Sequence, residues 1–302
     1  MTIRATIPRL PTQPGVYRFR DDRGRALYIG RATDLRRRVA SYWGDLKDRR
    51  HLRRMVPRIV AIEAVACQSV HEAAWLERNL LERAKPYWNR TRGGQEVPVY
   101  IRLEPTPRLR IIHSGHQPTD FGPYLGGLKV RTAVAALDRV LPVAYTGGRL
   151  TGSERDMARV RGIVPDSRAL LAATIAGVLA RDPAACAQVR DALAQRRDAA
   201  AAELAFEFAG RLQEELEAIE WVIAPQRVTV AGAGHGEVHG WADGVLVSFA
   251  IRDGRVNQWQ QRDAPQAPLA KLASTPAEWV SFATEAAGLA ARLRFAASLE
   301  SG

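Results

Sequence analysis

Glu77 is the residue whose position most suggests chemistry. A helix over residues 70–84, with about 100° between successive side chains, would place Glu77 in the middle of an apolar stripe. The stripe is formed by Ala73, Leu76, Leu80, Leu81 and Ala84. An inward carboxylate is costly unless it is paired or binds a cation. Two interpretations therefore stay open: a buried salt bridge to a nearby arginine, and a metal ligand.

Two tyrosines and an arginine could meet this carboxylate. Tyr28 lies between Leu27 and Ile29, so on a strand it faces away from both, and Tyr17 lies on the strand expected to pair with it. On a helix over residues 34–43, Arg38 flanks the apolar side and leans toward the sheet, whereas Arg37 points away. The apolar side is formed by Leu35, Val39, Tyr42 and Trp43. Each of these side chains taken alone is more often core or surface filler than a catalyst.

The strands that must position the tyrosines have clear local patterns. Residues 15–20, "GVYRFR", and 25–30, "RALYIG", alternate and are rich in aromatic and β-branched types, and "DDRG" between them favours a turn. They predict a β-hairpin. Residues 58–67 alternate enough to predict a third strand.

Two helices are expected to complete this part of the chain. The one over residues 34–43 is capped by Thr33 or Asp34, and a second short helix can follow at "RRHLRRMV". The helix over residues 70–84 begins at Ser69, in capping-box spacing with Glu72, and ends near Lys85-Pro86. Its polar face is expected to be solvated and carries His71, Arg78 and Glu82.

Positive charge is concentrated in the first third of the chain. Residues 1–95 hold 21 Lys and Arg against 9 Asp and Glu, whereas residues 96–302 hold 23 of each. This asymmetry indicates a polyanion such as nucleic acid, because neutralised phosphates release counterions. The alternative is a solvated arginine-rich face of the kind that high-GC codon usage produces. The candidate DNA-binding residues are Arg36, Arg37, Arg49, Arg50, Arg53 and Arg54.

Composition also bounds the cellular setting. Cys67 and Cys186 are far apart and lack metal-type spacing, and no signal-peptide pattern opens the chain. The longest apolar runs reach about half the length that a bilayer needs. We therefore expect a cytoplasmic protein with no membrane span.

The remaining chain predicts strands, then helices, then a small sheet. Residues 92–113 indicate strands and turns, and residues 113–127 a loop. Residues 130–224 are mostly helical, and the run over 199–223 looks like one long helix. Its apolar stripe is Leu204, Phe208, Leu212, Leu216 and Ile219. Residues 226–262 predict a sheet, and a helix closes the chain.

Several separate blocks resemble the GIY-YIG nuclease module. They are Gly15-Val16-Tyr17, Tyr28-Ile29-Gly30, Arg31-Ala32, Leu35, Arg38-Val39, Glu77, Pro86 and Asn89. Their order and spacing most resemble the version in the N-terminal half of the excinuclease UvrC and its short homologue Cho. The resemblance implies an α+β fold. A small mixed α/β domain, with a three-stranded antiparallel sheet flanked by helices, precedes a mostly helical accessory region and a small C-terminal β/α segment.

The resemblance also implies hydrolysis of a DNA phosphodiester with one divalent cation, Mg²⁺ or Mn²⁺. By match, Glu77 holds the metal and Tyr28 is the general base, a role that needs nearby cations because an unperturbed tyrosine has a pKa near 10. Arg38 would stabilise charge in the transition state, and Tyr17 would orient water or phosphate. Asn89 would support the geometry of the site.

Arg31 departs from the family pattern, because UvrC-type modules usually carry lysine there. The positive charge is kept, but arginine is bulkier and does not deprotonate. Any proton-relay role for this position is therefore in doubt.

The resemblance extends into four expected segments: the nuclease domain at 1–95, linker strands and helices at 96–199, a UVR-like helical segment at 200–224, and a β/α segment at 225–302. "DFGPYLGG" at 120–127 is similar to a loop that follows the module in UvrC. The UVR-like segment implies UvrB as a partner, but Leu212-Gln213 replaces a typical Arg-Asp pair. The sequence alone therefore leaves UvrB binding open.

The expected function is a single incision of damaged or structured double-stranded DNA, by analogy the 3′ cut of nucleotide excision repair. The segment 225–302 is too short for the second nuclease and the helix-hairpin-helix pair with which UvrC continues. One alternative is a DNA-binding scaffold whose nuclease site has decayed, although binding alone has no use for Glu77. Another is a nuclease that acts without UvrB on branched or cross-linked DNA.

Overall fold

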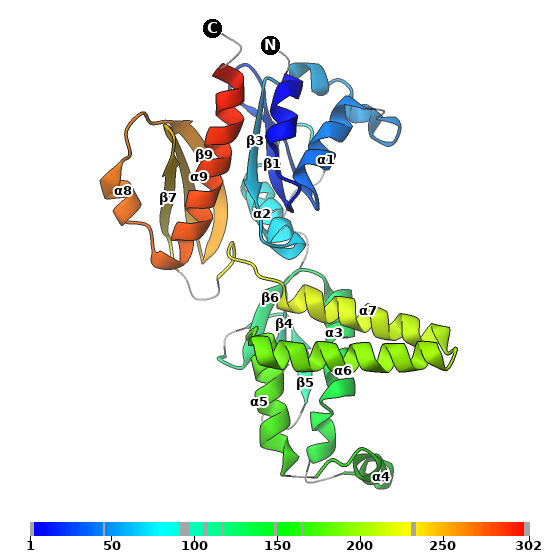
Figure 1. Cartoon of the computed structure of the whole chain (residues 1–302). Helices are drawn as coiled ribbons and strands as arrows, with labels where there is room; N and C mark the ends of the chain where they lie inside the picture. Colours follow the sequence, from blue (N-terminus) through cyan, green and yellow to red (C-terminus); the bar gives the residue numbers. More distant parts are fainter. Residues whose placement is uncertain are drawn as a thin grey trace. The chain divides into compact units, whose positions relative to one another are not determined.

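The computed structural model describes residues 3–44, 46–90, 97–104, 108–115, 117–147, 150–164, 166–230 and 234–298, without the side chains of 47–49 and 295–298 (Figure 1). The chain divides into two compact units. One unit joins Met1–Gln95 to Pro225–Gly302, and the other is Glu96–Ala224. Residues 225–302 therefore pack with the N-terminal residues, although more than a hundred residues separate them along the chain.

The first unit contains the predicted three-stranded antiparallel sheet. Its strands are β1 (Gly15–Arg20), β2 (Ala26–Ala32) and β3 (Ala61–Ala66), in the order β2-β1-β3. The register pairs Tyr17 with Gly30 and Phe19 with Tyr28. The α+β fold class and this sheet are confirmed.

Helices flank this sheet much as the local patterns predict. Helix α1 (Leu35–Ala40) begins after Asp34, whose side chain accepts a hydrogen bond from the backbone N–H of Arg37. 3₁₀ turns follow, with bounds Ser41–Trp43, Lys47–Leu52 and Val56–Arg58, and another covers Ile3–Arg9. Helix α2 (Val70–Arg83) is capped by Ser69, which accepts from the backbone N–H of Glu72.

The C-terminal residues of this unit form a second sheet and a long helix. Strands β7 (Gly236–Ala242), β8 (Val245–Arg252) and β9 (Arg255–Asp263) are antiparallel and consecutive. A short helix α8 (Leu269–Ala273) and the long α9 (Ala277–Ser298) follow. In Figure 1, α9 lies between this sheet and the N-terminal one, consistent with its contacts to β3, β7 and β8.

The second sheet corrects one expectation about α2. Strand β9 packs against this helix, and His71 and Arg78, which helical spacing places on a solvated face, are buried. Glu82 from the same face remains half exposed and pairs with Arg78 at 3.3 Å. The prediction was wrong because helical periodicity cannot show that a distant strand covers the polar side.

The second unit begins with a small sheet in the order β5-β4-β6. Its strands are β4 (Val99–Leu103), β5 (Leu109–Ile112) and β6 (Asp120–Tyr124). Strand β6 corrects the predicted loop over 113–127, because Asp120 is tied to Arg102 of β4 by an ion pair of 2.6 Å. The prediction was wrong because polar residues and a Gly-Pro pair are typical of loops, whereas here they lie in an edge strand.

Helices form the rest of the second unit: α3 (Gly127–Val140), a 3₁₀ turn (Val143–Thr146), α4 (Gly152–Val160), α5 (Ser167–Leu179), α6 (Pro183–Ala202) and α7 (Phe206–Ile223). The long helix predicted over 199–223 is wrong, because α6 and α7 form a hairpin. Leu204 sits at the break with φ of 58° and is 73% exposed, so it leaves the predicted apolar stripe. Leu212 and Ile219 are buried as predicted.

Among the described residues, no single helix is long and apolar enough to cross a membrane. By length and composition alone, α5 and α6 together could form a span, but the two helices are bent by 101° relative to each other.

Candidate active site

Three tyrosines meet beside the first sheet. Tyr17 of β1 is fully buried, and its hydroxyl lies 2.6 Å from that of Tyr42, which follows α1. Tyr28 of β2 shares a hydrogen bond with Tyr42, and its ring stacks on that of Tyr17 with 6.2 Å between centroids. The expected meeting of Tyr17 and Tyr28 is therefore present, with a third hydroxyl joining them.

Gly30 makes this packing possible. A β-carbon at this position would come within 2.6 Å of the Tyr17 hydroxyl and of the Tyr28 ring. Such distances are far shorter than van der Waals contact, so any side chain here would push the two rings apart. The glycine of the "YIG" block is thus required by the tyrosine pair.

Arg38 leans over the tyrosines, as its position on α1 predicts. Its Nε donates to the Tyr17 hydroxyl at 3.3 Å, and its guanidinium lies 5.7 Å from the centre of the Tyr42 ring. Arg37, one residue earlier, is exposed. Arg38 therefore brings positive charge to the hydroxyl cluster.

Tyr42 is the member of the cluster that the sequence interpretation missed as a polar participant. Its ring does line the apolar side of the helix, as predicted, but its hydroxyl bonds to both other tyrosines. The spacing of four residues after Arg38 could have indicated this, since residues i and i+4 share a helix face.

Glu77 of α2 lies at the edge of β2 and is paired with Arg31. One carboxylate oxygen accepts the backbone N–H of Arg31 at 3.1 Å, and the other lies 3.3 Å from its Nε. The Glu77 side chain is 21% exposed, so it is less buried than the apolar stripe predicts. The predicted salt bridge to a nearby arginine is therefore present, and part of the carboxylate side chain remains exposed to solvent.

Asn89 forms hydrogen bonds with the backbone of β2, the strand that carries Tyr28. Its side-chain oxygen accepts from the backbone N–H of Ile29 at 3.0 Å, and its amide donates to the Ile29 carbonyl at 2.8 Å. This buried pair of hydrogen bonds replaces a neighbouring strand along this edge of β2. Asn89 thus fixes the backbone beside Tyr28 without touching the hydroxyl cluster.

Burial controls the acidity of the cluster. It raises the pKa of Tyr17 well above the ordinary value, with Tyr28 adding to the increase and Arg38 opposing it. Burial likewise raises the pKa of Tyr28, and both Tyr42 and the negative charge of Glu77 add to that increase, while Arg38 lowers it. In the protein alone, the three hydroxyls are therefore protonated at neutral pH.

The candidate DNA-binding arginines lie outside this cluster. Arg37, Arg50, Arg53 and Arg54 are exposed, whereas the Nε of Arg36 donates to the Leu10 carbonyl at 2.7 Å. The side chain of Arg49 is outside the described residues. Arg36 is therefore held by a hydrogen bond within the fold, whereas the other four are exposed.

Comparison with known proteins places the whole cluster within one domain. Residues 13–90 match the family described as a UvrC-like GIY-YIG domain. The UvrABC system protein C of Mycolicibacterium paratuberculosis is 29% identical over 276 residues, covering 84% of this chain and 43% of that protein. Its counterpart from Syntrophotalea carbinolica is 28% identical over 270 residues, covering 82% and 44%. The chain thus spans less than half the length of these relatives.

A solved structure matches part of this chain. It is the GIY-YIG N-terminal endonuclease domain of UvrC from Thermotoga maritima bound to its catalytic magnesium, with 32% identity, 30% of this chain and 99% of that chain covered, and a TM-score of 0.27. The matched residues contain the tyrosine cluster, Arg38 and Glu77. Residues 13–90 of this chain therefore form a UvrC-like GIY-YIG domain.

Proposed function

We propose that this chain is a divalent-cation-dependent DNA endonuclease that nicks one strand of damaged or structured duplex. The observation that carries the proposal is the assembly of Tyr17, Tyr28 and Arg38 beside Glu77 within a UvrC-like GIY-YIG domain. A binding module would need the exposed arginines, but it would not need a carboxylate close enough to raise the pKa of Tyr28. This distinction favours the enzyme over a scaffold with a decayed site.

Glu77 is the proposed ligand for Mg²⁺ or Mn²⁺. Mg²⁺ keeps several waters and is often held by one or two carboxylates together with substrate phosphates. Glu77 fits that mode, because it offers one carboxylate that is 21% exposed and lies close enough to Tyr28 to affect its pKa. A cation bound there would polarise a phosphate oxygen and offset the negative charge that Glu77 directs at Tyr28.

Tyr28 is the proposed general base. Tyr28 is half-buried, whereas Tyr17 and Tyr42 are buried, and its hydrogen bond to Tyr42 holds it in place. In this proposal the phenolate of Tyr28, once formed, takes a proton from the attacking water. Tyr17 is bonded to Tyr42 and Arg38, and in this proposal it orients the attacking water or the phosphate. The burial that raises the pKa of Tyr28 also makes its phenolate a stronger base once it forms.

The positive groups divide into separate proposed roles. Arg38 stabilises negative charge on the phosphate in the transition state, and Arg31 keeps the Glu77 carboxylate oriented. Asn89 supports the strand beneath Tyr28. Arg31 pairs with the proposed metal ligand, so it competes with the cation for the Glu77 carboxylate. Lysine would compete less, because it lacks the planar guanidinium that matches a carboxylate.

For the pathway, we propose a UvrC-like 3′ incision in nucleotide excision repair, supported by the resemblance over most of this chain. The hairpin of α6 and α7 contains the UVR-like segment proposed to bind UvrB. A nuclease acting without UvrB is favoured by one observation: Leu212 is buried, and Gln213 accepts a hydrogen bond from Arg197 of α6 at 2.7 Å. Both residues therefore make contacts within the hairpin itself. Pull-down with UvrB separates the two pathways.

The proposed function is tested by removing and restoring the metal. The full chain should nick a labelled duplex in Mg²⁺ or Mn²⁺, lose this activity in EDTA, and regain it when either metal is returned. Binding of the same duplex, measured by fluorescence anisotropy, should persist in EDTA because the arginines supply it. A chain that binds duplex and branched DNA but nicks neither with either metal is a scaffold, and the proposal fails.

The exposed arginines are expected to set the salt dependence of binding. Replacing Arg53 and Arg54 together by alanine should lower the slope of log affinity against log salt by about 0.9 for each phosphate that these arginines neutralise. The nicking rate at saturating DNA should not change, since neither side chain reaches the tyrosines. Arg262→Ala, at an exposed arginine of β9, is the matched control. An unchanged slope in the double variant would remove these residues from the DNA surface.

A further inference from the structure

Glu72, in the first turn of α2, is the most buried carboxylate of this helix. Its side chain is 0% exposed. Its oxygens accept hydrogen bonds from the backbone N–H of Gln68 at 2.5 Å and from the backbone N–H of Arg227 at 2.8 Å. The Arg227 guanidinium also donates to the Glu72 carboxylate, from Nε at 3.0 Å and from Nη2 at 3.4 Å. A carboxylate buried this deeply requires such pairing, and its partner lies 155 residues away along the chain.

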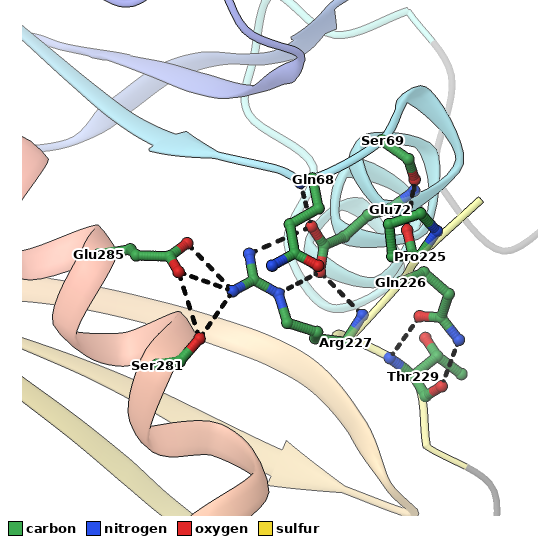
Figure 2. A network of polar contacts seen from close by, with 9 residues as sticks. All are labelled: Gln68, Ser69, Glu72, Pro225, Gln226, Arg227, Thr229, Ser281 and Glu285. Carbon is green, nitrogen blue, oxygen red and sulfur yellow. Dashed lines mark hydrogen bonds and ion pairs between the residues drawn. The ribbon is translucent and has the colours of Figure 1, made fainter. Parts of the chain in front are cut away.

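Arg227 also holds the long C-terminal helix. Its remaining nitrogen donates to both carboxylate oxygens of Glu285, at 3.1 and 3.0 Å, and to the Ser281 hydroxyl at 3.1 Å. The guanidinium lies 5.4 Å from the centre of the Phe282 ring. Figure 2 shows Arg227 between Glu72 on one side and Ser281 and Glu285 on the other. One side chain thus bridges α2 and α9.

Further contacts tie the same helix to the C-terminal residues. The Ser69 hydroxyl donates to the Pro225 carbonyl at 2.6 Å, and the Asn79 amide donates to the Thr229 hydroxyl at 3.1 Å. Near the end of the helix, Arg255 of β9 lies 3.5 Å from Glu82. The first turn of α2, its middle at Asn79 and its last turn are therefore each tied to the C-terminal residues.

Glu77 lies on the side of α2 that meets β2, where it contacts Arg31. The position of α2 relative to β2 therefore sets the distance between the carboxylate and the tyrosine cluster. A displacement of about 1 Å at such a site can cost about 100-fold in rate. The contacts made by Arg227 act on this displacement, because they hold the first turn of the helix.

We propose that residues 225–302 hold α2, the helix that carries the proposed metal ligand, in place against β2, with Arg227 as a positioning residue for Glu77. The inference rests on the proposed function, since it takes Glu77 as the metal ligand. It gives the C-terminal segment a role in the nuclease itself. Arg227 touches neither DNA nor metal in this role and acts only through α2.

The test measures metal affinity directly in the full chain. Arg227→Ala should weaken Mn²⁺ binding without DNA, followed by electron paramagnetic resonance, by about 10- to 100-fold, the usual loss when a residue that orients a metal ligand is removed. The Mg²⁺ concentration for half-maximal nicking should rise in parallel, while DNA affinity in EDTA stays the same. Arg227→Lys should recover part of the loss, and Arg262→Ala should behave as wild type.

Circular dichroism first establishes that each variant is folded. If Arg227→Ala does not fold, Glu285→Gln is tested in its place. This variant weakens the contact of Arg227 with α9 and leaves Glu72 paired with Arg227. It should still raise the Mg²⁺ concentration needed for half-maximal nicking measurably. A folded Arg227→Ala, or in its place Glu285→Gln, with wild-type Mn²⁺ affinity overturns the inference. Wild type that neither binds Mn²⁺ nor nicks would instead overturn the proposed function, so the two failures are distinct.

Discussion

Glu77→Gln is expected to lower the rate of nicking by about 10³-fold, which corresponds to roughly 4 kcal/mol of lost transition-state stabilisation. Glutamine has the same shape and still accepts the backbone N–H of Arg31, but it lacks the charge that holds a divalent cation. The lost ion pair with half-exposed Arg31 is worth at most about 1 kcal/mol, so the fold should persist. Single-turnover nicking in Mg²⁺ and Mn²⁺ measures the effect.

Two comparisons make this result specific. DNA binding by Glu77→Gln, measured in EDTA, should match wild type or improve slightly, because a negative charge near the phosphates has been removed. Glu278→Gln, at an exposed carboxylate in the first turn of α9, should nick normally. If Glu77→Gln retained full activity with both metals, Glu77 would be only the partner of Arg31, and the salt bridge would be its whole role.

Local patterns were sufficient for the part of the site built on adjacent elements. Alternation predicted the hairpin that pairs Tyr17 with Gly30, and helical spacing predicted that Arg38 and not Arg37 leans toward the tyrosines. Both depend only on residues within about one turn or one strand pair. The roles of Tyr28 and Glu77 came from the family resemblance and stay predictions.

Long-range packing explains what the sequence could not provide. Periodicity marked Glu77 as the inward carboxylate of α2, yet Glu72 is the fully buried one, because Arg227 arrives from a distant segment to pair with it. His71 and Arg78 are buried for the same reason, since β9 covers their face. Likewise, nothing local distinguishes the break at Leu204 from a continuing helix, because the hairpin depends on α6 and α7 packing together.

Tyr28→Phe is expected to lower the nicking rate by about 10²- to 10³-fold, within the range for loss of a general base. The ring that packs against Tyr17 is kept, so the cluster should remain assembled, and only the hydroxyl is lost. Metal affinity should be unchanged, which separates this variant from Glu77→Gln. Tyr87→Phe, at a tyrosine that is 85% exposed, is the matched control and should be fully active.

The pH dependence supplies a sharper test of the same residue. A general base acts in its deprotonated form, and burial holds the pKa of Tyr28 above its ordinary value. The wild-type rate should therefore rise with pH by about tenfold per unit from neutral to mildly alkaline conditions. Tyr28→Phe should lose this rise, because no titrating base remains in contact with the water. If the variant kept the same slope at a lower rate, hydroxide or another group would be the base, and Tyr28 would only position the water.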